Sequence, residues 1–306
     1  MIEITATVES FEQAQRLLEL DIDYLYFGDV SFGLRLPKHF TREEIKELVI
    51  LTHNAGKKAR VAVNAIMHPE KMLKLPEYLS FLEEIKVDEI VVGDTGVIHV
   101  LRRDNYELPF IYDAAMIVTS SRQINFWADR GAIGAVLARE IPYLELVELA
   151  KNIKVPGEML VYGANCIHQS KRPLVQNYFN FTNIDETVDK ERHLFISEPK
   201  DDETHYSIYE DEHGTHIFAT NDVNLMLELG QLDAAKLTHW KLDGIYTPGN
   251  DFVTVVEYFI EAKNLILSGN WTETEAQRLN QFVVASHPAE RGLDTGFYYL
   301  NPDEIR

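Results

Sequence analysis

The feature that most constrains this chain is a regular alternation between short runs rich in β-branched residues and longer helical runs. Strands separated by helices predict a parallel sheet, because parallel neighbours need a long crossover connection. We expect eight strands, at residues 2–8, 23–28, 60–64, 89–93, 110–113, 133–138, 158–162 and 240–243. Eight such units predict an α/β fold of the TIM-like (β/α)8 barrel type. A doubly wound open sheet is the alternative, but it usually has fewer strands.

The regular spacing is broken once, between the seventh and eighth strands. The interval from about 165 to 237 is far longer than an ordinary connection between a strand and a helix. Within it, β-rich runs at 205–209 and 215–219 stand on either side of a turn that ends at Gly214. This pattern predicts a β-hairpin, in a small insertion on the face of the barrel that carries the carboxyl ends of the strands.

The remaining organisation is a barrel over 1–270 and a short C-terminal extension over 271–306. Thr272, followed three residues later by Glu275, has the spacing of a helix-capping box. We therefore expect the extension to form one more helix and an extended segment, packed on the barrel.

Charge limits the partners of this chain. It carries 49 Asp and Glu residues against 29 Lys and Arg residues, a formal net charge of −20. Nucleic-acid binders gain affinity from positive charge, so we expect contact with RNA only indirectly or through a local basic patch. Apolar runs are too short to span a membrane, and the N-terminus has the pattern of a strand, not a signal peptide. The lone cysteine, Cys166, cannot form an internal disulfide, and we expect a cytoplasmic location.

Several polar residues stand at or just after the carboxyl ends of predicted strands, where barrel enzymes place their sites. Arg139 is followed by Glu140, and the two form either an ion pair or part of an anion clamp. Lys241 ends the eighth strand; it either pairs with a carboxylate such as Asp243 or, desolvated, could form a Schiff base. Two more candidate ligand-binding residues follow the second and third strands, namely Arg35 and Asn64.

Cysteine and histidine chemistry is the other possibility that the residues raise. Cys166 and His168 lie two residues apart, just beyond the seventh strand, and Cys166 is either a buried structural thiol or a nucleophile. His213 and His216 fall in the predicted hairpin and not on a helix, so we expect no metal site. The motifs of zinc proteases, serine hydrolases and phosphate-binding loops do not occur.

An ordered set of segments resembles peptidase family U32, the collagenase-like protease family. The sequence YFGDVSFGLR at 26–35 is similar to its "YFG…FGLR" segment, and VNAIMH at 63–68 is similar to its "VNAxxH" strand. The segment 162–178 resembles its signature "HGAxCxxxSGRCxxSNY", and RGLDTGF at 291–297 resembles its "RGFTTGF" tail. Each motif is weak alone, but together they follow the family order along nearly the whole chain.

The resemblance implies a TIM-like barrel and, despite the family name, a role in hydroxylation. Members of the family make 5-hydroxyuridine at the tRNA wobble position, with prephenate as the implied source of the hydroxyl, and others serve in ubiquinone hydroxylation. Those members hold an iron–sulfur cluster on four cysteines. Here only Cys166 matches, and Pro173 stands at the second cysteine position. We therefore expect no cluster in this chain. The positions that match the family leave an anion-friendly mouth made of Arg35, Asn64, Arg139, Arg172 and Lys241.

Some Gram-positive bacteria carry a short, cysteine-poor member beside a longer, cysteine-bearing one, and this chain is similar to the short kind. The resemblance thus implies a subunit of a prephenate-dependent tRNA wobble-uridine hydroxylation system. Its expected partner is the longer paralogue, in a hetero-oligomer, with a homodimer as the alternative. Two other interpretations stay open. One is a U32-type peptidase, and the other is a degenerate scaffold subunit, favoured by Tyr162 and Ile245 where the family has His and Arg.

Overall fold

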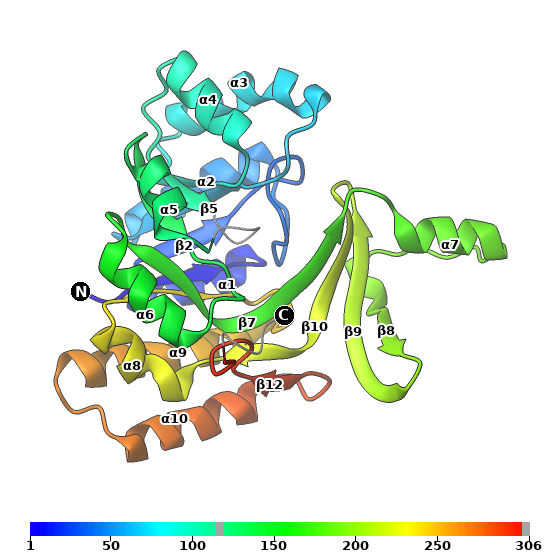
Figure 1. The fold of residues 1–306 in the computed structure, drawn as a ribbon. Helices are drawn as coiled ribbons and strands as arrows, with labels where there is room; N and C mark the ends of the chain where they lie inside the picture. The colour runs from blue at the N-terminus through cyan, green and yellow to red at the C-terminus, as the bar shows by residue number, and fades with distance from the viewer. Residues whose placement is uncertain (114–118, 302–306) are drawn as a thin grey trace.

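The computed structural model of the protein describes residues 1–113 and 119–301. Its central feature is a closed barrel of eight parallel strands (Figure 1), which confirms the expected fold class. The last barrel strand, β11, pairs with both β1 and β7 and thereby closes the sheet. The barrel strands are β1 (Glu3–Thr7), β2 (Tyr24–Phe27), β3 (Lys58–Val63), β4 (Glu89–Val92), β5 (Phe110–Asp113), β6 (Ala132–Val136), β7 (Gly157–Ser170) and β11 (His239–Leu242).

Helices surround the barrel and cover the apolar outer faces of its strands, and the main hydrophobic core lies between these two layers. Thr41 and Glu44 cap the second helix reciprocally, as a capping box does. The outer helices are α1 (Phe11–Leu18), α2 (Arg42–Asn54), α3 (Pro69–Glu84), α4 (Thr95–Arg103), α5 (Ser121–Ala128), α6 (Tyr143–Asn152), α8 (Leu229–Ala234) and α9 (Gly249–Leu267), with a 3-10 turn, η3 (Met226–Glu228), before α8. None of the helices described is both long and apolar enough to cross a membrane.

The interior of the barrel holds a buried charge network that the sequence did not reveal. Arg60 of β3 donates from Nε and Nη2 to Oε2 of Glu89, at 3.0 and 2.7 Å, and from Nη1 to Glu158 and to Oγ1 of Thr5. Its guanidinium also lies 3.8 Å from the centre of the Tyr24 ring. The two carboxylates and the ring offset the cost of burying this cation, so the barrel interior is a set of paired charges.

The insertion forms an arm that continues the barrel sheet. β7 does not end at residue 162 as expected; it runs on to Ser170 because β10 (Gly214–Asn224) pairs with its outer half in antiparallel fashion. The expected hairpin is present as β9 (Asp201–Asp211) and β10, with β8 (Phe195–Glu198) beyond it. Figure 1 shows the arm leaving the barrel, with α7 (Leu174–Thr182) projecting from its far end and η2 (Lys190–Arg192) leading to β8.

Gly163 stands where β7 passes from the barrel into the arm. Its φ is +121°, a region that residues with a Cβ rarely adopt, and an added Cβ would lie 2.2 Å from the carbonyl oxygen of Asp243. The bend and the close approach of β11 therefore both require glycine at this position.

The C-terminal extension begins with α10 (Glu273–Ser286), capped by Thr272 through the backbone N–H of Glu275. It continues into β12 (Gly292–Asp294), which adds to β10. Arg291 fixes this strand: its Nε donates to Oδ1 of Asp222 at 2.9 Å, and its Nη2 donates to the carbonyl of Ala219 at 2.8 Å. The extension therefore holds the base of the arm.

Substitution of Gly163 by Ala is predicted to cost at least about 4 kcal/mol of unfolding free energy, because the backbone of β11 would have to move. Gly56 is a matched control, since its φ is also positive, at +70°, but an added Cβ would meet nothing within 4 Å. Gly56→Ala should cost only about 1–2 kcal/mol. Urea unfolding of both variants makes the comparison, and equal costs would contradict the role given to Gly163.

The turn of the hairpin is seated on the barrel by a neutral histidine. His213 Nε2 donates to the carbonyl of Val30 at 2.7 Å, while Nδ1 accepts from Nζ of Lys71 at 3.0 Å. Burial, and then the charge of Lys71, lower the pKa of His213 to about 4. The unfolded chain, with a histidine pKa near 6.5, thus binds more protons than the folded chain between those two pH values.

Stability should therefore fall as the pH drops from 6.5 to 4, with up to about 3 kcal/mol of the loss coming from His213. Urea unfolding at a series of pH values should show a steeper slope for the natural chain than for His213→Gln, whose amide does not titrate. If the unfolding free energies of the two proteins fell in parallel between pH 6.5 and 4, His213 would not be the source of the pH dependence.

Candidate functional site

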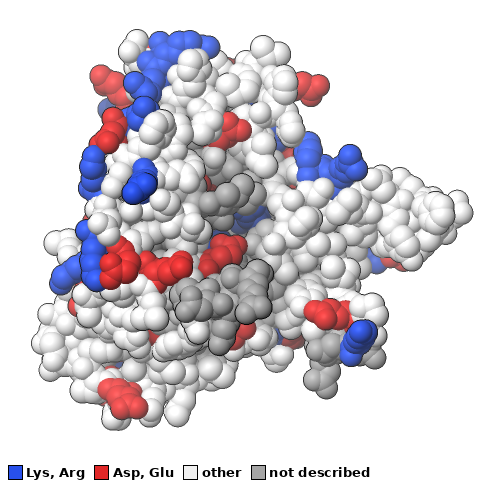
Figure 2. Space-filling view, viewed as in Figure 1, with Lys and Arg blue, Asp and Glu red and all other residues white. Residues whose placement is uncertain are grey.

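A polar cavity opens at the mouth of the barrel, where the carboxyl ends of the strands meet. It brings together five of the residues expected from sequence: Arg35, Asn64, Arg139, Lys241 and Asp243. Figure 2 shows a hollow near the middle of this face, with basic side chains visible inside it. The rest of the lining comes from Tyr26, Leu34, Val91, Asp113, Val136 and Glu158.

Lys241 approaches this cavity from β11. Its Nζ lies 3.6 Å from Oδ2 of Asp243 and 4.3 Å from the centre of the Tyr26 ring. Asp243 is itself fixed, because its Oδ1 accepts from the backbone N–H of Ile245 at 3.1 Å. Lys241 thus has a carboxylate and an aromatic face beside it, and both attract a cation.

Two arginines complete the positive side of the cavity. Arg35 follows β2 with a φ of +52°, an uncommon conformation for a residue with a side chain, and its Nη1 donates to Oε1 of Gln169 at 2.7 Å. Nη1 of Arg139 lies 3.3 Å from the carbonyl of Ala164 and 3.4 Å from Oδ1 of Asn165. In the part of the chain that the structure describes, neither arginine forms an ion pair with a carboxylate. Their remaining N–H donors are suited to an anionic ligand.

Asn64 holds in place the loop after β2, which carries Arg35. Its Oδ1 accepts from the backbone N–H of Leu34 at 2.9 Å, and its Nδ2 donates to Oδ2 of Asp113 at 3.0 Å. These bonds hold the loop that carries Arg35 against the carboxyl ends of β3 and β5. Asn64 therefore positions the arginine.

Four residues expected at the site do not line this cavity, and Cys166 is one of them. Glu140 is exposed and forms no ion pair with Arg139 among the described residues, since neighbouring residues at a strand end point in different directions. His168 and Arg172 are exposed on the arm, and His168 lies in β7, not in a loop as expected.

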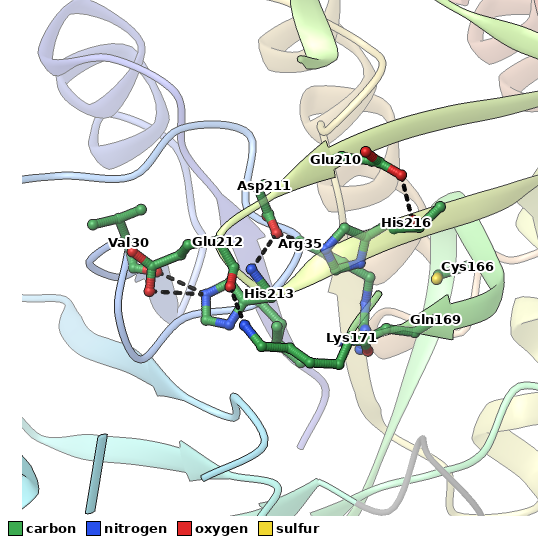
Figure 3. A network of polar contacts seen from close by, with 12 residues as sticks. Val30, Arg35, Cys166, Gln169, Lys171, Glu210, Asp211, Glu212, His213 and His216 are labelled. Carbon is green, nitrogen blue, oxygen red and sulfur yellow. Dashed lines mark hydrogen bonds and ion pairs between the residues drawn. The ribbon is translucent and has the colours of Figure 1, made fainter. Parts of the chain in front are cut away.

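The thiol of Cys166 donates to the backbone carbonyl of His168 at 3.3 Å, but the imidazole that influences the thiol is that of His216 of β10, not that of His168. Figure 3 shows Cys166 and His216 together with Arg35 and Gln169. Burial raises the pKa of Cys166, but the polar contact with His216 and the charges of Arg35 and Arg139 outweigh it and lower the pKa. This partner depends on the register between β7 and β10, which no local pattern in the sequence encodes.

The donor set around Cys166 does not fit an iron–sulfur cluster. The chain has a single cysteine, whereas such clusters use four thiolates. The side chains packed around it are apolar and aromatic, from Ala164, Tyr209, Phe218 and Tyr246. Among residues 1–113 and 119–301, no group of three His, Cys, Asp or Glu side chains is arranged to hold a metal ion.

Sequence reasoning missed Glu158 and Asp113, which give the cavity its negative side. Glu158 begins the predicted seventh strand, and the alternation of side chains along a strand could have placed it inside the barrel. Its partner Arg60 belongs to a short basic run of the sequence at 57–60, a pattern typical of a solvated surface, yet it is 2% exposed.

Comparison with known proteins places this geometry in a family. Among curated relatives, tRNA hydroxylation protein P2 of Bacillus subtilis (strain 168) is 34% identical over 302 residues, covering 97% of each chain. tRNA hydroxylation protein P1 of the same organism is 24% identical, covering 89% of this chain and 67% of its own length. tRNA hydroxylation protein P of Escherichia coli (strain K12) is 22% identical, covering 72% of this chain and 59% of its own.

Among solved structures, a dihydrodipicolinate synthase aligns with a TM-score of 0.50, over 92% of this chain and 80% of that one, at 9% identity. A likeness at this identity concerns the barrel fold alone. The sequence model of peptidase family U32 matches residues 9–306. The protein therefore belongs to peptidase family U32.

Proposed function

We propose that this chain is a subunit of a tRNA hydroxylation system that makes 5-hydroxyuridine at the wobble position, and that its barrel mouth binds prephenate. The similarity to tRNA hydroxylation protein P2 over nearly the whole of both chains supports the reaction. The observation that carries the ligand is the cavity with Arg35, Arg139 and Lys241, in which both arginines lack a carboxylate partner in the described chain. Prephenate is a dicarboxylate, and guanidinium groups bind carboxylates with two hydrogen bonds.

In this proposal each cavity residue has a defined task. Arg35 and Arg139 bind the carboxylates, and Lys241 supplies a third positive charge from β11. Asn64 holds the Arg35 loop in place. Glu158 and Asp243 limit the net charge of the cavity, so that only an anion of matching shape is retained.

We further propose that the chain works in the cytoplasm with a longer, cysteine-bearing relative. Bacillus subtilis has two separate relatives, tRNA hydroxylation proteins P1 and P2, and the match covers 67% of the length of P1 but 97% of that of P2. A net charge of −20 disfavours direct binding of tRNA, so a partner that supplies the RNA-binding surface would remove this difficulty. The family's iron–sulfur cluster would likewise belong to that partner, since four thiolates are not available here.

Helix α7 provides the surface at which we expect a protein partner to bind. Residues 173–184 contain no charged side chain, in a chain that is 25% charged. No residue of the helix is buried; Phe181 is 85% exposed and Tyr178 is 58% exposed. Figure 2 shows the projection as a largely uncharged surface. Apolar side chains exposed on a projecting helix are typical of a docking element.

The ligand is tested by calorimetric titration of the purified chain with prephenate. We expect micromolar affinity, reduced at least about tenfold by Arg139→Ala and by Lys241→Ala, because each removes a charge-assisted contact worth about 1.5–3 kcal/mol. Arg172→Ala is the matched control, since Arg172 is exposed on the arm, and it should leave the affinity unchanged. If no heat of binding were measured at millimolar prephenate, the proposal that the chain binds prephenate would be contradicted, and the scaffold interpretation would be favoured.

The reaction is tested in a bacterium from which the genes of its own family members have been deleted. Expression of this chain with the longer relative should restore 5-hydroxyuridine in digested tRNA, measured by mass spectrometry. The Arg139→Ala and Lys241→Ala double variant should not restore it. Restoration by the longer relative alone, at the same level, would contradict a role for this chain.

A further inference from the structure

Cys166 lies at the root of the arm, on the outer half of β7, beside the barrel mouth. Its side chain is partly exposed and packs on a small cluster that includes Tyr209, Phe218 and Tyr246. It is the only cysteine in the 306 residues, so any thiol chemistry of the protein is located here.

His216 approaches this thiol from β10. Its side chain has no exposed surface, and its Nε2 lies 2.9 Å from Oδ1 of Asp211. Its Nδ1 is buried and has no hydrogen-bond partner of normal geometry among the described residues. A buried polar atom without a partner destabilises the folded state, so a bound group that supplies a partner is favoured. The imidazole is thus oriented by a carboxylate on one side and has a free nitrogen available for the thiol, in the order Cys, His, Asp that activates cysteine nucleophiles.

The ionisation of the three groups agrees with this order. Burial lowers the pKa of His216, but the bond with Asp211 and the contact with Cys166 outweigh it and raise the pKa. The pKa of Cys166 is lowered, as described above, and that of Asp211 is lowered by His216 despite its burial. The charged and titratable groups that act on the thiol or on His216 are Arg35, Arg139, Asp211, Tyr209 and Tyr246.

Both arginines of the cavity are tied to the strand segment that carries the thiol. Arg139 lies within reach of Ala164 and Asn165, the two residues before Cys166, and Arg35 donates to Gln169, three residues after it. A carboxylate bound by these guanidiniums would lie beside the strand segment that carries the thiol. In a 2-oxo acid the electrophilic carbonyl carbon is bonded directly to the carboxylate, so binding of the carboxylate brings this carbon near the same segment.

We propose that Cys166 is a nucleophile for small 2-oxo acids, with Arg35 and Arg139 binding the carboxylate and His216 transferring the proton. The thiol proton passes to His216, and the sulfur forms a bond to the carbonyl carbon. The π electrons of the carbonyl move to its oxygen, which takes the proton back from His216. The product is a thiohemiketal, formed reversibly and without an oxidant or a leaving group.

This inference rests on the proposed function in one respect, because prephenate itself carries a 2-oxo acid side chain. Separate experiments test the binding of prephenate and the reactivity of Cys166, so either proposal can fail without the other. Titration with prephenate measures carboxylate binding whether or not the thiol reacts, while alkylation of Cys166 measures the thiol whether or not tRNA is modified.

The experiment follows the rate of alkylation of the intact protein by mass spectrometry over a range of pH. Neutral iodoacetamide reports the ionisation of the thiol, and anionic iodoacetate adds the effect of the guanidiniums. With iodoacetamide, the natural chain should reach half its maximal rate at a lower pH than His216→Gln and Asp211→Asn. The same midpoint in the natural chain, in both variants and in the urea-unfolded protein would overturn the proposal.

The anion preference is tested by the ratio of the two rates. Iodoacetate should react faster relative to iodoacetamide in the natural chain than in Arg35→Gln or Arg139→Gln, by about tenfold, the low end of the effect of a charge-lined cleft. An unchanged ratio would overturn the role of the arginines.

The ligand class is tested by protection against iodoacetamide. Pyruvate and lactate have the same carboxylate and nearly the same size, but only pyruvate has a carbonyl that the thiol can attack. We expect pyruvate to slow alkylation more than lactate at equal concentration, and to lose this advantage in His216→Gln. Equal protection by the two acids would overturn covalent addition.

Discussion

The structure depends on the fact that one strand, β7, belongs to two sheets at once. Its first half closes the barrel between β6 and β11, and its second half pairs with β10 to form the arm. Gly163 makes the change possible, because its backbone conformation and its contact with Asp243 both exclude a side chain. The outer half then carries Cys166 past the mouth and supplies the oxygen atoms that hold Arg35 and Arg139. The same strand therefore closes the barrel and fixes the geometry of the site.

The charge distribution gives the site its character. The chain as a whole has a net charge of −20, yet the barrel mouth collects two arginines and a lysine. Below them, Arg60 is neutralised by Glu89 and Glu158, and Lys241 is paired with Asp243. The two arginines therefore have the most N–H donors available to a ligand, and Lys241 adds a third positive charge to the same cavity. A negative exterior around a pocket that presents two guanidiniums favours a small anion over a polyanion such as RNA.

Much of the fold follows from local patterns, and so does part of the site. Eight strands, the capped helix after Thr272 and the hairpin whose turn ends at Gly214 are all determined by short stretches of sequence. Because barrel sites lie at the carboxyl ends of strands, Arg139 and Lys241 could be placed at the mouth without coordinates. Pairing between distant segments could not be predicted in the same way. The length of β7 and the approach of His216 to Cys166 both depend on the register with β10, some fifty residues further along the chain.

The most direct test of the cation-lined mouth as a binding site is a crystal structure of the chain with prephenate. The account predicts the ligand in the barrel-mouth cavity, with carboxylate oxygens at hydrogen-bond distance from the guanidiniums of Arg35 and Arg139. A ligand bound elsewhere on the molecule, or an empty mouth in crystals held at saturating prephenate, would contradict it.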